Sequence, residues 1–213
     1  MMYLTQMMVD CEAMSRLCIR DAYEWHQRIW ECFPNRDGQR RDFLTRFDDK
    51  GDHVRLLILS HTEPTRPDWC SPKMWQGPKQ IGDGFLGHRH YRFELRANAT
   101  KKVRVGNRAD GTRRKQGRRV SLRAREDLIA WLEAKAQAGG FSIDPDTVRI
   151  MPRGRSSFAG KKGRRGVHDG VDFHGVLTVT DRDKFRDTFS TGIGSAKAFG
   201  FGMLMIQPLR GGR

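Results

Sequence analysis

The chain contains few cysteines and no long apolar segment. Its four cysteines, Cys11, Cys18, Cys32 and Cys70, fall at irregular spacings without a C-x-x-C pair, which argues against a zinc ribbon or a disulfide framework. No run of 18 apolar residues is present, so the sequence predicts no membrane-spanning helix. The first residues lack the basic and apolar regions of a signal peptide. These absences favour a cytoplasmic protein in which Cys18 and Cys32 serve as small core residues of a helix.

Acidic residues are also scarce. The 213 residues include 40 Lys+Arg against 25 Asp+Glu, which gives a formal net charge of +15. That excess predicts a polyanionic partner, and nucleic acid, an acidic protein or an anionic membrane would each satisfy it. Eleven basic residues lie in 101–125 and seven in 149–165. Two dense clusters favour one shared anionic ligand over a merely solubilising loop. The candidate phosphate-binding side chains are Arg113, Arg114, Lys115, Arg118, Arg119, Arg153, Arg155, Arg164 and Arg165.

Apolar periodicity predicts two successive β-α-β-β-α-β units. For the first unit we expect strands over 3–9, 43–47, 54–59 and 91–97, and helices over 16–32 and 68–76. For the second we expect strands near 103 and over 147–151, 171–179 and 201–207, a helix over 125–138 and a short helix capped by Asp181. This order predicts an α+β fold with two tandem ferredoxin-like (RRM-like, βαββαβ) domains, one spanning residues 1–98 and the other 99–213.

No metal site or other cofactor is predicted. His88 and His90 would share one face of a strand and could offer two metal ligands, but no third ligand lies nearby in the sequence. We therefore interpret both histidines as solvated loop residues.

A glycine-rich segment spans 192–204. Clustered glycines let backbone N–H groups approach an anion closely, so Gly192, Gly194, Lys197 and Gly200 are candidate residues for binding the predicted polyanionic partner. The segment lacks the Gly-Lys-Ser/Thr ending of a Walker A loop. It runs from helix to strand, whereas a dinucleotide fingerprint runs from strand to helix. It matches the RNP1 motif of RRM domains only in part.

The same segment resembles a known family. Its pattern is Gly192-x-Gly194-x-Ala196-Lys197-x-x-Gly200-x-Gly202-x-Leu204 followed by Gln207-Pro208-Leu209, which resembles the C-terminal signature of the CRISPR-associated repeat endoribonucleases of the CasE type. Further matching segments run through both halves of the chain. They are Tyr3-Leu4-Thr5, Tyr23-x-x-His26-x-x-x-Trp30, Phe33-Pro34, Phe93-x-Leu95-Arg96-Ala97-Asn98, Ala130-Trp131-Leu132 and Phe173-x-Gly175-x-Leu177. One departure is Ala99, where the family usually has proline.

The resemblance implies a tandem ferredoxin-like protein that binds the stem-loop of a CRISPR repeat RNA. It would cut at the 3′ base of the stem and stay bound to the product as a subunit of the Cascade complex. The cut of the family needs no metal and leaves a 2′,3′-cyclic phosphate and a 5′-hydroxyl.

His26 is the candidate catalytic residue. Tyr23 and His26 are three residues apart on the predicted helix and therefore share a face, and His26 lies at the boundary between core and surface. Attack by the 2′-hydroxyl of RNA needs an acid and a base, and histidine can serve as either. Tyr23 would position the substrate or assist proton transfer. The resemblance implies that a hairpin lysine, Lys161 or Lys162, stabilises the developing phosphate charge. Without the resemblance, a boundary histidine is more often structural.

Two alternative functions remain at this stage. The first is a non-cleaving RNA-binding module of the same fold, and the second is an architectural protein that binds duplex DNA. Dependence on the 2′-hydroxyl separates RNA from DNA, because backbone charge alone does not.

Overall fold

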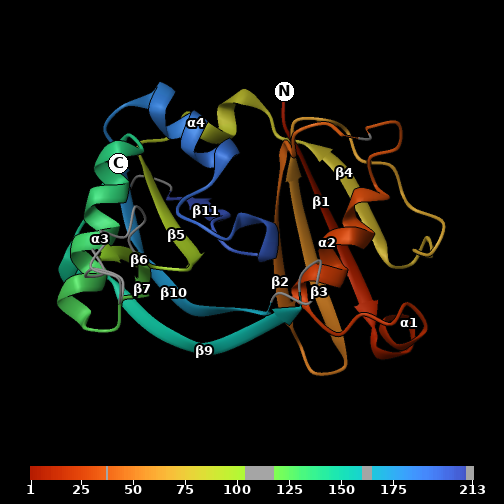
Figure 1. Ribbon diagram of the computed structural model, residues 1–213. Coiled ribbons are helices and arrows are strands. Elements are labelled where there is room, and N and C mark those ends of the chain that lie inside the picture. The colour runs from red at the N-terminus through yellow and green to blue at the C-terminus, as the bar shows by residue number, and fades with distance from the viewer. Residues whose placement is uncertain (37, 104–117, 160–164, 210–213) are drawn as a thin grey trace, which may run out of the picture.

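The protein has a mixed α/β fold with antiparallel sheets. The computed structural model describes residues 1–36, 38–103, 118–159 and 165–209. The first sheet is four-stranded in the order β2-β3-β1-β4. Its strands are β1 (Tyr3–Asp10), β2 (Phe43–Asp49), β3 (His53–Ser60) and β4 (Trp75–Gln80). Two helices, α1 (Cys11–Arg16) and α2 (Ala22–Trp30), connect β1 to β2, and α2 covers the outer face of the sheet (Figure 1).

The second sheet has the order β11-β5-β10-β8, and β9 pairs with β10. Its strands are β5 (His90–Ala97), β8 (Phe141–Ile143), β9 (Arg149–Ala159), β10 (Arg165–Val179) and β11 (Leu204–Pro208). The helices of this half are α3 (Arg125–Ala138) and α4 (Arg182–Thr191), and the described residues also form three short 3-10 helices. These are η1 (Asp83–Leu86), η2 (Pro145–Thr147) and η4 (Lys197–Phe199). No helix in the described ranges is long and apolar enough to cross a membrane.

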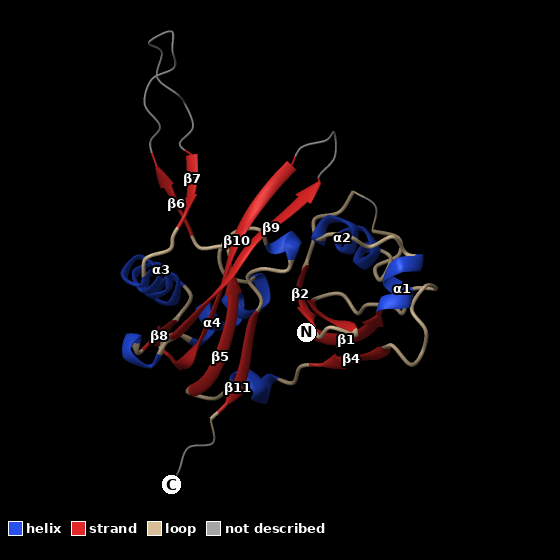
Figure 2. Cartoon of the chain, turned by 90° about the horizontal axis from the view of Figure 1, so that it is seen from below, coloured by secondary structure: helices blue, strands red, loops and turns tan. Residues whose placement is uncertain are grey.

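Two hairpins project from the second half of the chain. Strands β6 (Thr100–Val103) and β7 (Arg118–Ser121) form a separate two-stranded sheet. The longer β9–β10 hairpin projects on the same side of the molecule (Figure 2). In both Figures 1 and 2 the far end of β9 lies beside α2, and the two elements are in contact. The β9–β10 hairpin therefore reaches from the second sheet to the first.

The strand over 91–97 was predicted to complete the first unit, and this is wrong. The corresponding strand, β5, pairs with β10 and β11 in the second sheet. The fourth strand of the first sheet is β4, which pairs with β1. The predicted helix over 68–76 does not form either: turns and bends span most of 68–74, and β4 begins at Trp75. The apolar alternation of β5 identifies a strand but not its partners. Register partners such as Leu95 and Leu204 are more than 100 residues apart in sequence.

The predicted helix over 16–32 forms only from Ala22 to Trp30, as α2, because α1 has already ended at Arg16. Cys18 has a left-handed φ of 55°, a conformation that interrupts a right-handed helix. Asp21 then starts α2 with a capping box, in which its side chain accepts hydrogen bonds from two backbone N–H groups of the first turn. Cys18 is consequently exposed. Cys32, the other cysteine predicted to be a core residue, is buried, as are Trp25 and Ile29.

The first sheet is buried on both faces. In β3, Leu56 and Ile58 pack in the core beneath α2, whereas Leu57 and Leu59 pack in the core of the second sheet. Successive side chains of a strand point to opposite faces. The continuous apolar run 56–59 therefore reflects a sheet sandwiched between α2 and the second half of the chain.

A buried charge network joins the two sheets. Arg96 of β5 donates hydrogen bonds to Asp48 of β2 and to Asp172 of β10, each at 3.0 Å. Arg46 bonds Asp48 at 3.0 Å and also pairs with Glu94. Burial by itself raises the pKa of Asp48, but a hydrogen bond from Arg55 and the charges of Arg46 and Arg96 outweigh burial and lower this pKa to about 2. Because removal of one partner of such a pair leaves a buried charge unmatched, the network fixes how the two sheets meet.

Candidate active site

The capping box at Asp21 orients α2 so that His26 lies at the edge of the core. Trp25 and Ile29 are buried and anchor the helix on the first sheet. His26 is half-buried, as its predicted boundary position requires. Tyr23 lies one turn earlier on the same helix and is also half-buried. Within the described part of the chain its hydroxyl makes no hydrogen bond to protein, so this group is available to a ligand.

Aromatic rings surround the imidazole of His26. The indole Nε1–H of Trp30 donates a hydrogen bond of 3.2 Å to His26 Nε2, and the ring of Phe43 lies 6.2 Å from the imidazole, centroid to centroid. Because Nε2 accepts this hydrogen bond, the neutral ring carries its proton on Nδ1. Nδ1 is shielded from solvent and has no partner among the described residues.

Burial lowers the pKa of His26, and the nearby positive charge of Arg41 lowers it further. Both effects disfavour the charged imidazolium form. His26 is therefore neutral at pH 7 and can accept a proton.

The glycine-rich segment lies between the two halves of the molecule. Its 3-10 helix η4 contacts both α2 and β2 (Figure 1). Gly192, Gly194 and Gly200 all have left-handed φ values, of 77°, 82° and 82°. A Cβ atom at Gly192 would lie 2.9 Å from Leu44, and one at Gly200 would lie 2.4 Å from the ring of Phe47. The structure thus gives these two glycines a packing role against β2, and Gly200 is itself buried.

Replacing Gly200 with alanine is expected to destabilise the protein more than the same change at Gly51. Both glycines have left-handed φ values, but a Cβ atom at Gly51 would meet nothing within 4 Å. Backbone strain of about 1–2 kcal/mol applies to both, and overpacking against Phe47 should add roughly 1–3 kcal/mol for Gly200→Ala. Urea unfolding measures the difference. Equal destabilisation of the two variants would show that Phe47 moves aside and that the packing at Gly200 is not restrictive.

Four of the nine predicted phosphate-binding residues fall outside the described residues. They are Arg113, Arg114, Lys115 and Arg164, together with the candidate catalytic lysines Lys161 and Lys162. Arg118 opens β7 and Arg165 opens β10. Arg153 bonds Asp172 at 3.3 Å, so part of its charge is already paired.

Arg119 and Arg155 line one open cleft between the two hairpins, with a volume of about 670 Å³. The side chain of Arg155 is 68% exposed and lies 3.9 Å from Asp169.

A second groove, of about 460 Å³, runs along the glycine-rich segment. Its cationic lining residues are Lys102, Arg119, Lys135 and Lys197. Trp131 and the polar side chains of Asn98 and Ser195 complete the groove. Lys197 was predicted from the glycine motif, whereas Lys135 was not, because its position in the last turn of α3 is typical of an ordinary helix.

One group of potential metal ligands occurs among the described residues. The ligand atoms of Glu94, Asp172 and His174 lie within 4.8 Å of one another. Both carboxylates are already bound by arginines of the buried charge network, since Arg46 pairs with Glu94 and Arg96 with Asp172. Ion pairs with these arginines therefore explain why the two carboxylates lie close together. Of the two histidines considered in the sequence, His90 bonds Thr178 through Nδ1 at 3.1 Å.

The site thus combines a neutral histidine, cation-lined grooves and antiparallel sheets in one α/β protein. Residues 2–208 match a family described as CRISPR associated protein. The chain is 31% identical to the CRISPR system Cascade subunit CasE of Escherichia coli K12, over 98% of this chain and 100% of that protein. It is 25% identical to the CRISPR-associated endoribonuclease Cse3 of Thermus thermophilus, over 97% and 100% of the two chains. The chain therefore belongs to the CRISPR-associated protein family.

A solved structure supports the same relationship. Thermus thermophilus Cse3 bound to an RNA representing a pre-cleavage complex matches with a TM-score of 0.75 and 25% sequence identity. The match covers 97% of this chain and 99% of that one. The mixed α/β architecture with antiparallel sheets is shared along almost the whole chain.

Proposed function

We propose that this protein is an endoribonuclease that cuts the stem-loop of a CRISPR repeat RNA at the 3′ base of the stem. The observation that carries the proposal is His26, a neutral imidazole held where α2 lies beside η4 and the far end of β9. Its relatives, named as a Cascade subunit and as an endoribonuclease, support the same activity. After the cut the protein keeps the processed guide RNA and acts as a Cascade subunit in the cytoplasm.

The reaction needs no metal in this proposal. The 2′-hydroxyl of the nucleotide before the cut loses its proton to His26 and attacks the adjacent phosphorus. The bond from phosphorus to the 5′ oxygen breaks, which leaves a 2′,3′-cyclic phosphate, and the departing oxygen takes up a proton from water to become a 5′-hydroxyl. The lowered pKa of His26 favours the role of base over that of acid. Tyr23 positions the substrate or assists proton transfer.

Substrate binding must change one hydrogen bond of His26. In the free protein the Nε2 lone pair accepts the indole N–H of Trp30. The 2′-hydroxyl of a bound RNA would take the place of that N–H, and apo structures commonly hold catalytic groups in such provisional hydrogen bonds. Lys161 or Lys162 would stabilise the negative charge that develops on the phosphate. The approach of β9 to α2 supports this, because both lysines follow β9 in the sequence.

We further propose two tandem ferredoxin-like units. In the first sheet, β2-β3-β1-β4, the first strand of the unit is β1, and it lies between the third strand, β3, and the last strand, β4. In the second sheet the first strand is β5, and it lies in the same way between β10 and the last strand, β11, with β8 and β9 at the edge. The pairing of β5 supports a division between Gln80 and His90 instead of after Asn98. The first unit has α2 but lacks the predicted second helix.

The hairpin of β6 and β7 is proposed to bind RNA phosphates. Changing Arg113, Arg114, Lys115, Arg118 and Arg119 to glutamine should weaken RNA binding. It should also reduce the slope of log affinity against log salt by roughly 0.7 to 0.9 for each phosphate that the variant no longer neutralises. Fluorescence anisotropy at several salt concentrations measures both quantities.

A matched control removes five exposed charges from the first half of the chain, namely Arg16, Arg20, Lys50, Lys73 and Lys79. If affinity and slope fell equally in both variants, net charge alone would explain binding and the hairpin would have no special role.

The function is tested by incubating the protein with a labelled repeat RNA and with DNA of the same sequence. We expect a single cut in the RNA, a product that stays bound, and no cut in the DNA. Binding without cutting would favour a non-cleaving RNA-binding module. Equal affinity for duplex DNA of unrelated sequence would favour an architectural protein.

A further inference from the structure

Arg41 lies beside His26 but has no part in the mechanism described so far. Arg41 lies just before β2, and its side chain is on the same side of the chain as that of Phe43, two residues later. Its guanidinium carbon lies 5.8 Å from the centroid of the Phe43 ring, and the imidazole of His26 lies 6.2 Å from the same centroid. Both side chains therefore lie near the same aromatic ring.

Arg41 differs from the other inward-pointing arginines because none of the acidic residues that the structure describes pairs with it. Arg46 and Arg96 each bond carboxylates of the buried charge network. Arg41 forms no ion pair within the described ranges, and its Nη1 is shielded from solvent without a hydrogen-bond partner there. A buried donor of a charged group is costly when unpaired. The residue is still partly exposed, so a ligand can reach the guanidinium.

A second cation faces the same region. Lys197, of the glycine-rich segment, donates a hydrogen bond of 2.7 Å to the carbonyl oxygen of Thr191. Burial lowers the pKa of Lys197, and the positive charges of Arg41 and Lys135 lower it further. Like charges gathered in this way repel one another, and a bound anion would relieve the repulsion.

We propose that Arg41 binds the scissile phosphate, through a non-bridging oxygen, and stabilises the charge that this phosphate gains during attack. This inference rests on the proposed function and adds to it a catalytic residue from the segment before β2 that the CasE-type motif does not include. A guanidinium suits the task because it is planar, always charged and able to donate two parallel hydrogen bonds to a phosphate. Its place beside His26 puts charge stabilisation and proton transfer at one phosphate.

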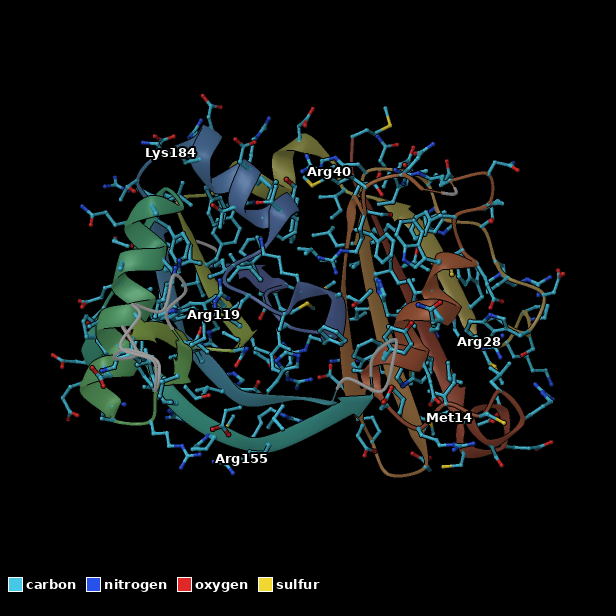
Figure 3. The ribbon with its side chains drawn as sticks, viewed as in Figure 1. Met14, Arg28, Arg40, Arg119, Arg155 and Lys184 are labelled. Carbon is cyan, nitrogen blue, oxygen red and sulfur yellow. The ribbon has the colours of Figure 1, made fainter. Side chains whose placement is uncertain are left out.

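The test compares Arg41→Gln, Arg41→Lys and the neighbouring control Arg40→Gln. Arg40 is exposed (Figure 3), so its variant removes the same charge without removing the proposed hydrogen bond. With protein in excess, Arg41→Gln should slow cleavage of repeat RNA by roughly 10²-fold to 10³-fold and Arg41→Lys by less. Arg40→Gln should cut at the wild-type rate.

A sulfur substitution at the scissile phosphate separates phosphate binding from folding. One of the two phosphorothioate diastereomers should slow the wild type, because sulfur accepts the hydrogen bond from Arg41 poorly. The same substitution should slow Arg41→Gln much less, since that variant has no guanidinium to donate the bond. A merely structural role for Arg41 would leave this sulfur effect unchanged.

Three outcomes would overturn the inference. Wild-type cleavage rates in Arg41→Gln would show that the guanidinium does not act, and an unchanged sulfur effect in Arg41→Gln would show that it does not touch the phosphate. In both cases the wild type still cuts, so the proposed function stands. Absence of cutting by the wild type would instead overturn both.

Discussion

Replacing His26 with alanine is expected to slow cleavage of repeat RNA by roughly 10²-fold to 10⁴-fold, the usual contribution of a positioned acid or base. RNA affinity should remain nearly unchanged, because phosphate contacts supply most of the binding energy and His26 is neutral at pH 7. The rate is measured at pH 7 with protein in excess, and the affinity in a separate titration. Such a split between rate and affinity distinguishes a proton-transfer group from a binding residue.

The matched control is His88→Ala. His88 is exposed and lies between η1 and β5, in the second half of the molecule. This variant should cut at the wild-type rate. Thermal unfolding of both variants shows whether the fold survives, since His26 contacts Trp30 and Phe43. A folded His26→Ala variant that cuts normally would return His26 to a structural role, as the edge of an aromatic cluster.

Local patterns predicted those elements whose signals lie within a few residues. The helix Arg125–Ala138 has the predicted bounds, and Asp181 caps α4, where Phe185 and Phe189 are both buried. The helix over 16–32 was wrong because a single left-handed residue, Cys18, and the capping box of Asp21 outweigh a continuous apolar period. The spacing of apolar residues alone does not show where a helix begins.

Strand partners and packing glycines could not be predicted in the same way. The alternation in β5 looks the same whether the strand completes the first sheet or the second, because pairing depends on residues more than 70 positions away. The glycines were predicted to bind RNA, and this stays a prediction. The packing reason for Gly200, however, lies in the ring of Phe47, a residue 153 positions earlier in the sequence.

The candidate site was predictable only in part. His26 could be named from its helix position and the family motif, and its half-buried setting fits that prediction. Arg41 could not, because one arginine among 40 basic residues carries no local signal. Its distinguishing feature is the lack of an acidic partner in the described structure, which is a property of three-dimensional packing.

The second prediction concerns the RNA itself. A repeat RNA with a single 2′-deoxy nucleotide before the cut lacks the attacking group, so cleavage should stop completely. Binding should persist, because the stem and its phosphates are unaltered. Excess EDTA should leave cleavage of the unmodified RNA unchanged, since in the proposed reaction His26 moves the proton and cationic side chains stabilise the phosphate charge.

The most direct measurement of the central claim combines both conditions in one assay. Labelled repeat RNA, unmodified or with the single 2′-deoxy substitution, is incubated with excess protein in EDTA, and the products are resolved by gel. The account predicts full cutting of the unmodified RNA to a 2′,3′-cyclic phosphate and none of the deoxy RNA. Cutting of the deoxy RNA would contradict it by making water the nucleophile, as would activity that EDTA abolishes and Mg²⁺ or Mn²⁺ restores.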